Sequence, residues 1–169
     1  MTSLSRFRMA GLLAASALGF VAPRPARAQD SGLPVGSVAP SATLQTLDGR
    51  SVDLAKVAQG PSVIEFWAPW CENCELLLPA MQKAQATYGK RDRFDAVAVN
   101  VNQSVARVKL HAAKYHVPGE QLYDTKGDAT GKWDVPATSY VVVLDKKGKV
   151  VYSGVGGDQD IVKAAAKAL

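Results

Sequence analysis

The sequence predicts an α/β domain in which strands and helices alternate around a central sheet. Short runs rich in Val and Ile recur along the chain, as at residues 62–67 and 94–101. Other segments carry apolar residues at helical spacing, and turn residues such as Asp48-Gly49 separate the elements. We find no internal repeat, no low-complexity tract and no second domain.

A β-hairpin is expected first, because Asp48-Gly49 has turn chemistry between residues 43–47 and 50–53. A strand at 62–67 follows. The next helix places an apolar stripe at i, i+4, i+7 and i+11, formed by Leu77, Met81, Ala84 and Tyr88. Such a stripe must lie on a sheet.

The second half continues the alternation. A Val-rich strand at 94–101 precedes a helix that ends before Pro118 and has on one face Val105, Val108, Ala112 and Tyr115. Strands at 139–144 and 149–153 flank the turn at 145–148. The last helix is expected to begin near Asp158, which can cap it, and to run to the C-terminus.

Residues 1–28 have the pattern of a secretory signal peptide. Arg6 and Arg8 form a basic region, an apolar run extends from Met9 to Ala22, and 26–28 reads Ala-Arg-Ala. The domain would then span 29–169, and we expect it to be exported to the periplasm. A mitochondrial transit peptide is the alternative, and an uncleaved membrane anchor is a second one, although the apolar run is short for a bilayer.

The net charge of the chain is much lower without residues 1–28. The chain has 20 Lys+Arg and 15 Asp+Glu, and residues 1–28 hold four of the Arg and no acid, which leaves 16 against 15. The basic charge therefore belongs to the leader. The remaining lysines read as a solvated surface, and nothing points to nucleic acid.

The only two cysteines, Cys71 and Cys74, can pair only with each other. A bridge that closes so short a loop constrains the unfolded chain little, so a redox role is the better explanation. At a helix N-terminus the Cys71 thiolate is favoured, and it can attack a partner's disulfide. Cys74 then resolves the mixed disulfide.

Two metal-based roles are alternatives for this pair. A structural zinc site needs four ligands, and only His111 and His116 could complete one, about 140° apart on a helix. Covalent haem attachment needs His after the second cysteine, and this chain has Glu75. We therefore expect no metal and no cofactor, although the two thiolates could carry Cu(I).

The run Phe66-Trp67-Ala68-Pro69-Trp70-Cys71-Glu72-Asn73-Cys74 resembles the active-site segment of the thioredoxin superfamily. Pro79 is similar to the proline of that family's active-site helix, and residues 133–138 resemble its cis-proline loop. The segments 35–40 and 47–54 are similar to the leading hairpin of exported TlpA/ResA-type thiol-disulfide oxidoreductases. Leu77 departs from that branch, which often has Glu there. The resemblance implies a thioredoxin-like fold, with a central mixed sheet flanked by helices and an N-terminal hairpin extension.

The resemblance also implies roles for single residues. Glu65 would be a buried acid that moves a proton to or from Cys74. Pro136 would be a cis-proline facing the cysteines, and Val135 would offer its backbone to a substrate segment. We expect Trp67 in the core and Trp70 on the rim, where it helps to bind substrate.

These residues together predict an exported protein thiol-disulfide oxidoreductase with a redox-active Cys71–Cys74 disulfide. Glu72 beside Cys71 disfavours the thiolate and so favours a reductase, for example in cytochrome c or copper-site maturation. A disulfide-forming oxidase and a Cu(I) carrier are the alternatives. Expected partners are protein disulfides or thiols and a membrane electron donor, and the protein is expected to be a monomer.

Overall fold

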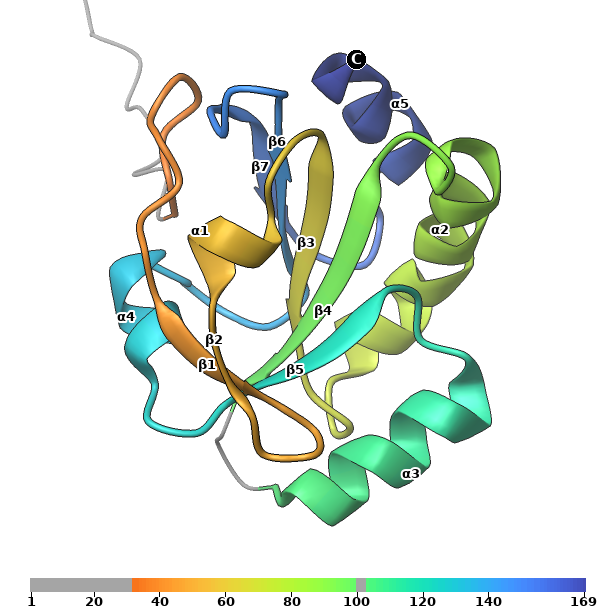
Figure 1. Ribbon diagram of the computed structural model, residues 1–169. Helices are drawn as coiled ribbons and strands as arrows, with labels where there is room; N and C mark the ends of the chain where they lie inside the picture. The colour runs from red at the N-terminus through yellow and green to blue at the C-terminus, as the bar shows by residue number, and fades with distance from the viewer. Residues whose placement is uncertain (1–31, 100–102) are drawn as a thin grey trace, which may run out of the picture.

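The computed structural model describes residues 32–99 and 103–169 and shows one seven-stranded sheet between helices (Figure 1). The strand order is β2-β1-β5-β4-β3-β6-β7. The strands are β1 (Thr43–Thr46), β2 (Ser51–Asp53), β3 (Ser62–Trp67), β4 (Arg93–Val99), β5 (Glu120–Asp124), β6 (Tyr140–Leu144) and β7 (Val150–Val155). The helices are α1 (Leu54–Val57), α2 (Glu72–Tyr88), α3 (Val105–Tyr115), α4 (Asp128–Lys132) and α5 (Ile161–Ala165), and a 3₁₀ turn at Ala166–Ala168 follows.

Strand β3 runs through the middle of the sheet and leads into the cysteine pair. It pairs in parallel with β4 and antiparallel with β6, so the sheet is mixed, as predicted. All six residues of β3 are buried, which is expected of a strand covered on both faces.

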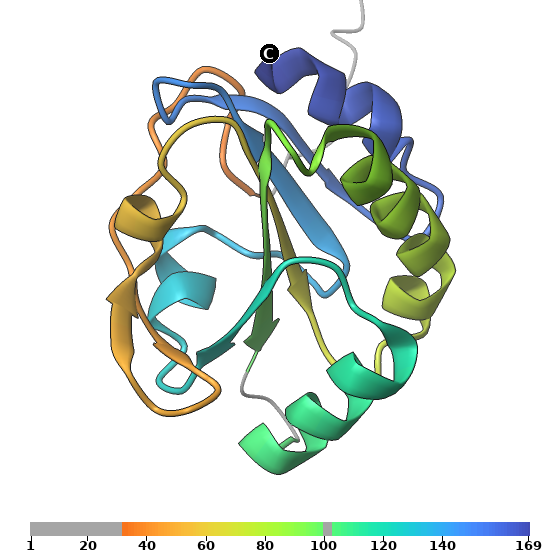
Figure 2. The ribbon, with the colours of Figure 1, turned by 45° about the vertical axis from the view of Figure 1, so that its right-hand side comes forward.

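Helices cover both faces of the sheet (Figure 2). On one face lie α2, α3 and α5, and Val63 of β3 belongs there to a cluster with Leu77 and Met81 of α2. On the other face lie α1 and α4, and Phe66 packs there against the rings of Trp133 and Tyr140. Strand β3 is thus held from both sides up to its last residue.

The main predicted elements are confirmed. The β1–β2 hairpin pairs Gln45 with Ser51 across the predicted turn, β3 has the predicted bounds, and α3 ends at Tyr115, before Pro118. The stripe on α2 is buried at Leu77, Met81 and Ala84. The predicted strand at 94–101 is β4, and residues 100 and 101 lie outside the described part of the chain.

The C-terminal helix differs from its prediction. It begins at Ile161, its cap is Asp160, whose side chain accepts a hydrogen bond from Lys163 N, and it ends in the 3₁₀ turn. Asp158 lies instead in the loop that follows β7. Three elements were not predicted at all: α1, β5 and α4.

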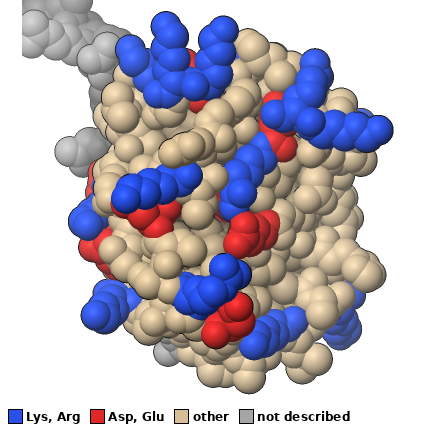
Figure 3. All heavy atoms as spheres, in the orientation of Figure 1, with Lys and Arg blue, Asp and Glu red and all other residues tan. Residues whose placement is uncertain are grey.

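The predicted signal peptide lies outside the described residues. Within 32–99 and 103–169, no helix is long and apolar enough to cross a membrane. Basic and acidic side chains are interspersed over the face shown in Figure 3, which agrees with the nearly balanced charge of residues 29–169.

Candidate active site

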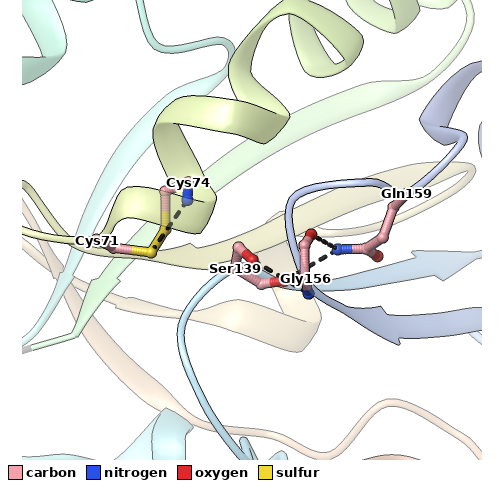
Figure 4. The surroundings of a disulfide bond; sticks show 5 residues. All are labelled: Cys71, Cys74, Ser139, Gly156 and Gln159. Carbon is pink, nitrogen blue, oxygen red and sulfur yellow. Dashed lines mark hydrogen bonds between the residues drawn. A yellow bond between two sulfur atoms is a disulfide. The ribbon is translucent and has the colours of Figure 1, made fainter.

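Cys71 and Cys74 form a disulfide where β3 passes into α2 (Figure 4). Their Cα atoms are 5.3 Å apart. Cys71 is the N-cap of α2 in an extended conformation, and its Sγ accepts a hydrogen bond from Cys74 N at 3.1 Å. Both side chains are buried, with exposed fractions of 6% and 8%. The helix N-terminus predicted for Cys71 is confirmed.

The helix terminus and its charges act on Cys71 in opposite directions. The N–H groups at the start of α2 and the helix dipole favour a thiolate at Cys71. Glu72 and Glu75 lie in the same first turn, and their negative charges disfavour it. Cys71 and Cys74 can therefore exchange disulfides with a partner. The Cys71 thiolate is less stabilised than it would be at the same helix terminus without Glu72 and Glu75.

Glu65 is buried in the middle of β3, as predicted. Its exposed fraction is 2%, and burial raises its pKa from the ordinary 4.5 to about 8. Its atom Oε1 has no hydrogen-bond partner among the described residues. A carboxyl group with such a pKa exchanges protons near neutral pH, which suits a general acid or base.

Glu65 and Cys74 line the same small cavity, of about 10 Å³. Trp67 and His111 line it as well, and the two rings lie 5.4 Å apart between centroids. Glu75, Leu78 and Val117 complete the lining. The cavity therefore connects the buried carboxyl with the second cysteine and with α3.

The expectation of a cis-proline at Pro136 is wrong. No peptide bond in the described residues is cis, so the Val135–Pro136 bond is trans, and Pro136 is exposed. It lies four residues before the start of β6, on a loop that follows α4. Val135 N donates to Thr130 O at 3.0 Å, so this N–H is used within the protein, and a role for Val135 in substrate pairing could involve only its carbonyl group.

Ser139 lies beside the disulfide instead, directly before β6 (Figure 4). It is fully buried and has a positive φ of 28°, a strained conformation for a residue with a side chain. Its Oγ accepts from Gly156 N at 3.2 Å, and its carbonyl accepts from Gln159 Nε2 at 3.0 Å. Ser139 was not predicted from the sequence as a residue of the site. The one sequence feature that points to it is a small polar residue directly before the apolar run 140–144.

The loop after β7 approaches the start of α2 closely. A Cβ atom on Gly157 would lie 2.7 Å from Cβ of Leu76 and 3.1 Å from the carbonyl oxygen of Asn73. Trp70 and Leu76 are exposed on this side, with fractions of 43% and 68%, so the predicted rim position of Trp70 and the core position of Trp67 are confirmed. Two exposed apolar side chains, Trp70 and Leu76, thus lie close in sequence to the two cysteines.

Within the described ranges, no three His, Cys, Asp or Glu side chains are grouped so that they could hold a metal ion.

The chain is similar to known thiol-disulfide oxidoreductases. It is 31% identical over 125 residues to the thioredoxin-like protein YneN of Bacillus subtilis, covering 72% of each chain. It is 27% identical over 152 residues to the thiol-disulfide oxidoreductase ResA of Geobacillus thermodenitrificans, covering 89% of this chain and 87% of that one.

Solved structures agree with the fold. A Chlorobium tepidum protein assigned as the thiol:disulfide interchange protein DsbE superposes with a TM-score of 0.66 at 26% identity, covering 80% of this chain and 95% of that one. A thiol:disulfide interchange protein from Bacteroides sp. gives a TM-score of 0.68 at 23% identity, covering 80% and 90%. These similarities confirm the thioredoxin-like fold.

A family model described as Redoxin matches residues 34–169, which include both cysteines, the whole sheet and the C-terminal helix. The chain belongs to the Redoxin family.

Proposed function

We propose that this protein is an exported thiol-disulfide oxidoreductase that reduces disulfides in other proteins. The observation that carries the proposal is the closed Cys71–Cys74 bridge at the N-terminus of α2, with the buried Glu65 beside Cys74 on a shared cavity. The relatives named thiol-disulfide oxidoreductase support the reaction class.

The reaction proceeds through a mixed disulfide. The Cys71 thiolate attacks a substrate disulfide, forms a bond to one substrate sulfur and releases the other as a thiolate. Cys74 then attacks Cys71, which closes the bridge and releases the second substrate thiolate. Glu65 takes the proton of Cys74, directly or through a water, because its pKa of about 8 lies close to that of a thiol.

The direction of electron flow is argued from the charges around Cys71. Glu72 and Glu75 in the first turn of α2 disfavour the thiolate and hence the reduced form. A pair whose reduced form is less stabilised has a more reducing potential. Sustained reduction requires an electron donor, and for an exported protein we propose a membrane protein in that role.

The leader-like pattern of residues 1–28 supports the proposed location, and the exposed Trp70 and Leu76 support a contact with protein substrates. We propose that the mature protein acts in the periplasm as a monomer. Apocytochrome c or copper-site thiols are proposed as substrates because the sequence resembles exported TlpA/ResA-type proteins. The exposed Trp70 and Leu76 offer apolar area for contact with a protein substrate.

The equilibrium potential of the Cys71–Cys74 pair tests this proposal. The mature protein would be equilibrated with defined thiol/disulfide buffers, alkylated and measured by mass shift, with Cys71→Ser as the control. A value near that of thioredoxin, about −270 mV, supports the reductase. A value near about −120 mV would show a disulfide-forming oxidase. Failure to close the bridge, combined with tight Cu(I) binding, would favour metal carriage.

A further inference from the structure

Two buried polar atoms beside Cys74 lack a hydrogen-bond partner within the described residues. They are Oε1 of Glu65 and Nε1 of Trp67, and both residues line the same cavity. Leaving a buried polar group without a partner costs about 1–3 kcal/mol. A cavity of about 10 Å³ is close to what one water needs, and a water there can donate to the carboxyl oxygen and accept from the indole N–H.

His111 forms the wall of this cavity on the α3 side. The side chain is half-buried, so its ring connects the cavity with the surface. Its position is fixed by the rings on either side, with Trp67 at 5.4 Å and Tyr115 at 4.4 Å between centroids. It is an ionisable side chain held between the buried carboxyl and solvent.

We propose that the proton on the Glu65 carboxyl exchanges with solvent through one water in this cavity and through His111. The inference rests on the proposed function, in which Glu65 takes the proton of Cys74. His111 acts through Glu65 and the water, so it is a positioning residue and touches neither substrate nor the reacting sulfur atoms.

The relay serves the second step of the reaction. When Cys74 attacks the mixed disulfide, the bond between Cys71 and Cys74 forms and the bond between Cys71 and the substrate sulfur breaks. The substrate leaves as a thiolate with the electron pair of that bond, and the proton of Cys74 moves to Glu65. A carboxyl group with a pKa of about 8 is mostly protonated at pH 7, so Glu65 must first release its own proton through the water and His111 to solvent before it can accept that of Cys74.

The surroundings of Glu65 leave few other routes. Its neighbours on the adjacent strands are Ala96 of β4 and Val141 of β6, which do not titrate. On the α2 side the titratable groups of the cavity are Cys74 itself and Glu75, whose side chain is exposed. His111 and Glu75 are therefore the two candidate exits, and His111 contacts the Trp67 ring inside the cavity.

The charges around His111 keep it able to accept a proton. Burial lowers its pKa, Glu75 of α2 opposes this, and Lys114 and Arg107 of α3 add to the lowering. The net shift is downward, so the ring is mostly neutral at neutral pH and can take a proton before releasing it to solvent.

The test separates the two steps of exchange by stopped flow. Reduced protein is mixed with one equivalent of dithiobis(nitrobenzoate), which releases one aromatic thiolate on attack by Cys71 and a second when Cys74 resolves the mixed disulfide. In His111→Phe, which keeps a ring against Trp67, and in His111→Gln, we expect the second phase to slow by about tenfold with the first unchanged. Added imidazole should restore the second phase in both variants.

The matched control is His116→Asn, which removes the other histidine at a position with a φ of 52° that asparagine accepts. It should behave as the wild type and should not respond to imidazole. Urea unfolding establishes that each variant is folded, and either His111 variant alone decides the question if the other does not fold.

Two results would overturn the relay. One is a second phase in the His111 variants equal to that of the wild type, or slow but indifferent to imidazole. The other is a second phase that slows about tenfold in Glu75→Gln and not in the His111 variants. That result would show that the proton leaves through Glu75. Glu65→Gln separates this failure from that of the proposed function: if it resolves at the wild-type rate, Glu65 has no part in the proton transfer at all.

Discussion

Replacing Glu65 with glutamine should make the oxidised protein more stable at neutral pH. Glutamine has the same size and stays neutral, so the change removes the titration and keeps a buried polar side chain. The unfolded chain releases the Glu65 proton near the ordinary pKa of 4.5, whereas the folded protein holds it up to about pH 8. Between these values the folded state binds more protons, so wild-type stability falls as the pH rises.

The size of the effect follows from this window. Each pH unit above 4.5 costs the wild type about 1.4 kcal/mol of the free energy of unfolding, until the folded protein also loses the proton. Glu65→Gln should therefore equal the wild type near pH 4 and exceed it by about 3 kcal/mol at pH 7. The gain is confined to stability, because the same variant should resolve mixed disulfides slowly.

The assay is urea unfolding of the oxidised proteins from pH 4 to pH 8.5, with the disulfide closed so that neither cysteine titrates. Glu72→Gln is the matched control, since it removes an exposed carboxylate from α2. A stability difference between Glu65→Gln and the wild type that stays constant with pH would refute the reasoning. So would a variant that is less stable than the wild type at pH 7.

Three further changes have expected outcomes. Gly157→Ala should lower stability by about 1–2 kcal/mol in urea unfolding, because its Cβ would lie 2.7 Å from Cβ of Leu76; an unchanged midpoint would contradict the close approach. Arg93→Ala should cost about 3 kcal/mol by the same measurement, because it leaves the buried Asp95 without the cation 2.8 Å away; a loss below 1 kcal/mol would count against this. Trp70→Ala should slow reduction of a protein disulfide several-fold and leave a small aromatic disulfide unaffected, and equal slowing of both would rule out a docking role.

The elements that the sequence predicted are those with strong local signals. The start of α2 is marked by Cys71 at its cap and by the apolar stripe at Leu77, Met81 and Ala84, and both are local in sequence. Strand β5 was missed because it reads Glu-Gln-Leu-Tyr-Asp, with little of the apolar character of an inner strand. Strand β5 forms because it pairs with β4 on one side and with β1 on the other. The sequence of β5 alone does not predict this pairing.

The residues of the site also differ in whether the local sequence could predict them. The cysteines and Glu65 were identified from one short segment, because strand and helix place them at fixed spacing. Pro136 was assigned by resemblance alone, and the residue beside the disulfide proved to be Ser139. That position depends on how β6 enters the sheet and on hydrogen bonds from Gly156 and Gln159, which are distant in sequence from the cysteines.

The bonds from Gly156 and Gln159 to Ser139 also bear on how the protein is made. Synthesis proceeds from the N-terminus, so both cysteines emerge long before β6, β7 and the loop that holds Ser139. A nascent chain halted before Tyr140 would carry the complete cysteine motif, yet β3 would lack its antiparallel neighbour and the disulfide would lack one wall. The thiols are therefore chemically complete early in synthesis, and they acquire their folded surroundings only when the last segment of the chain arrives.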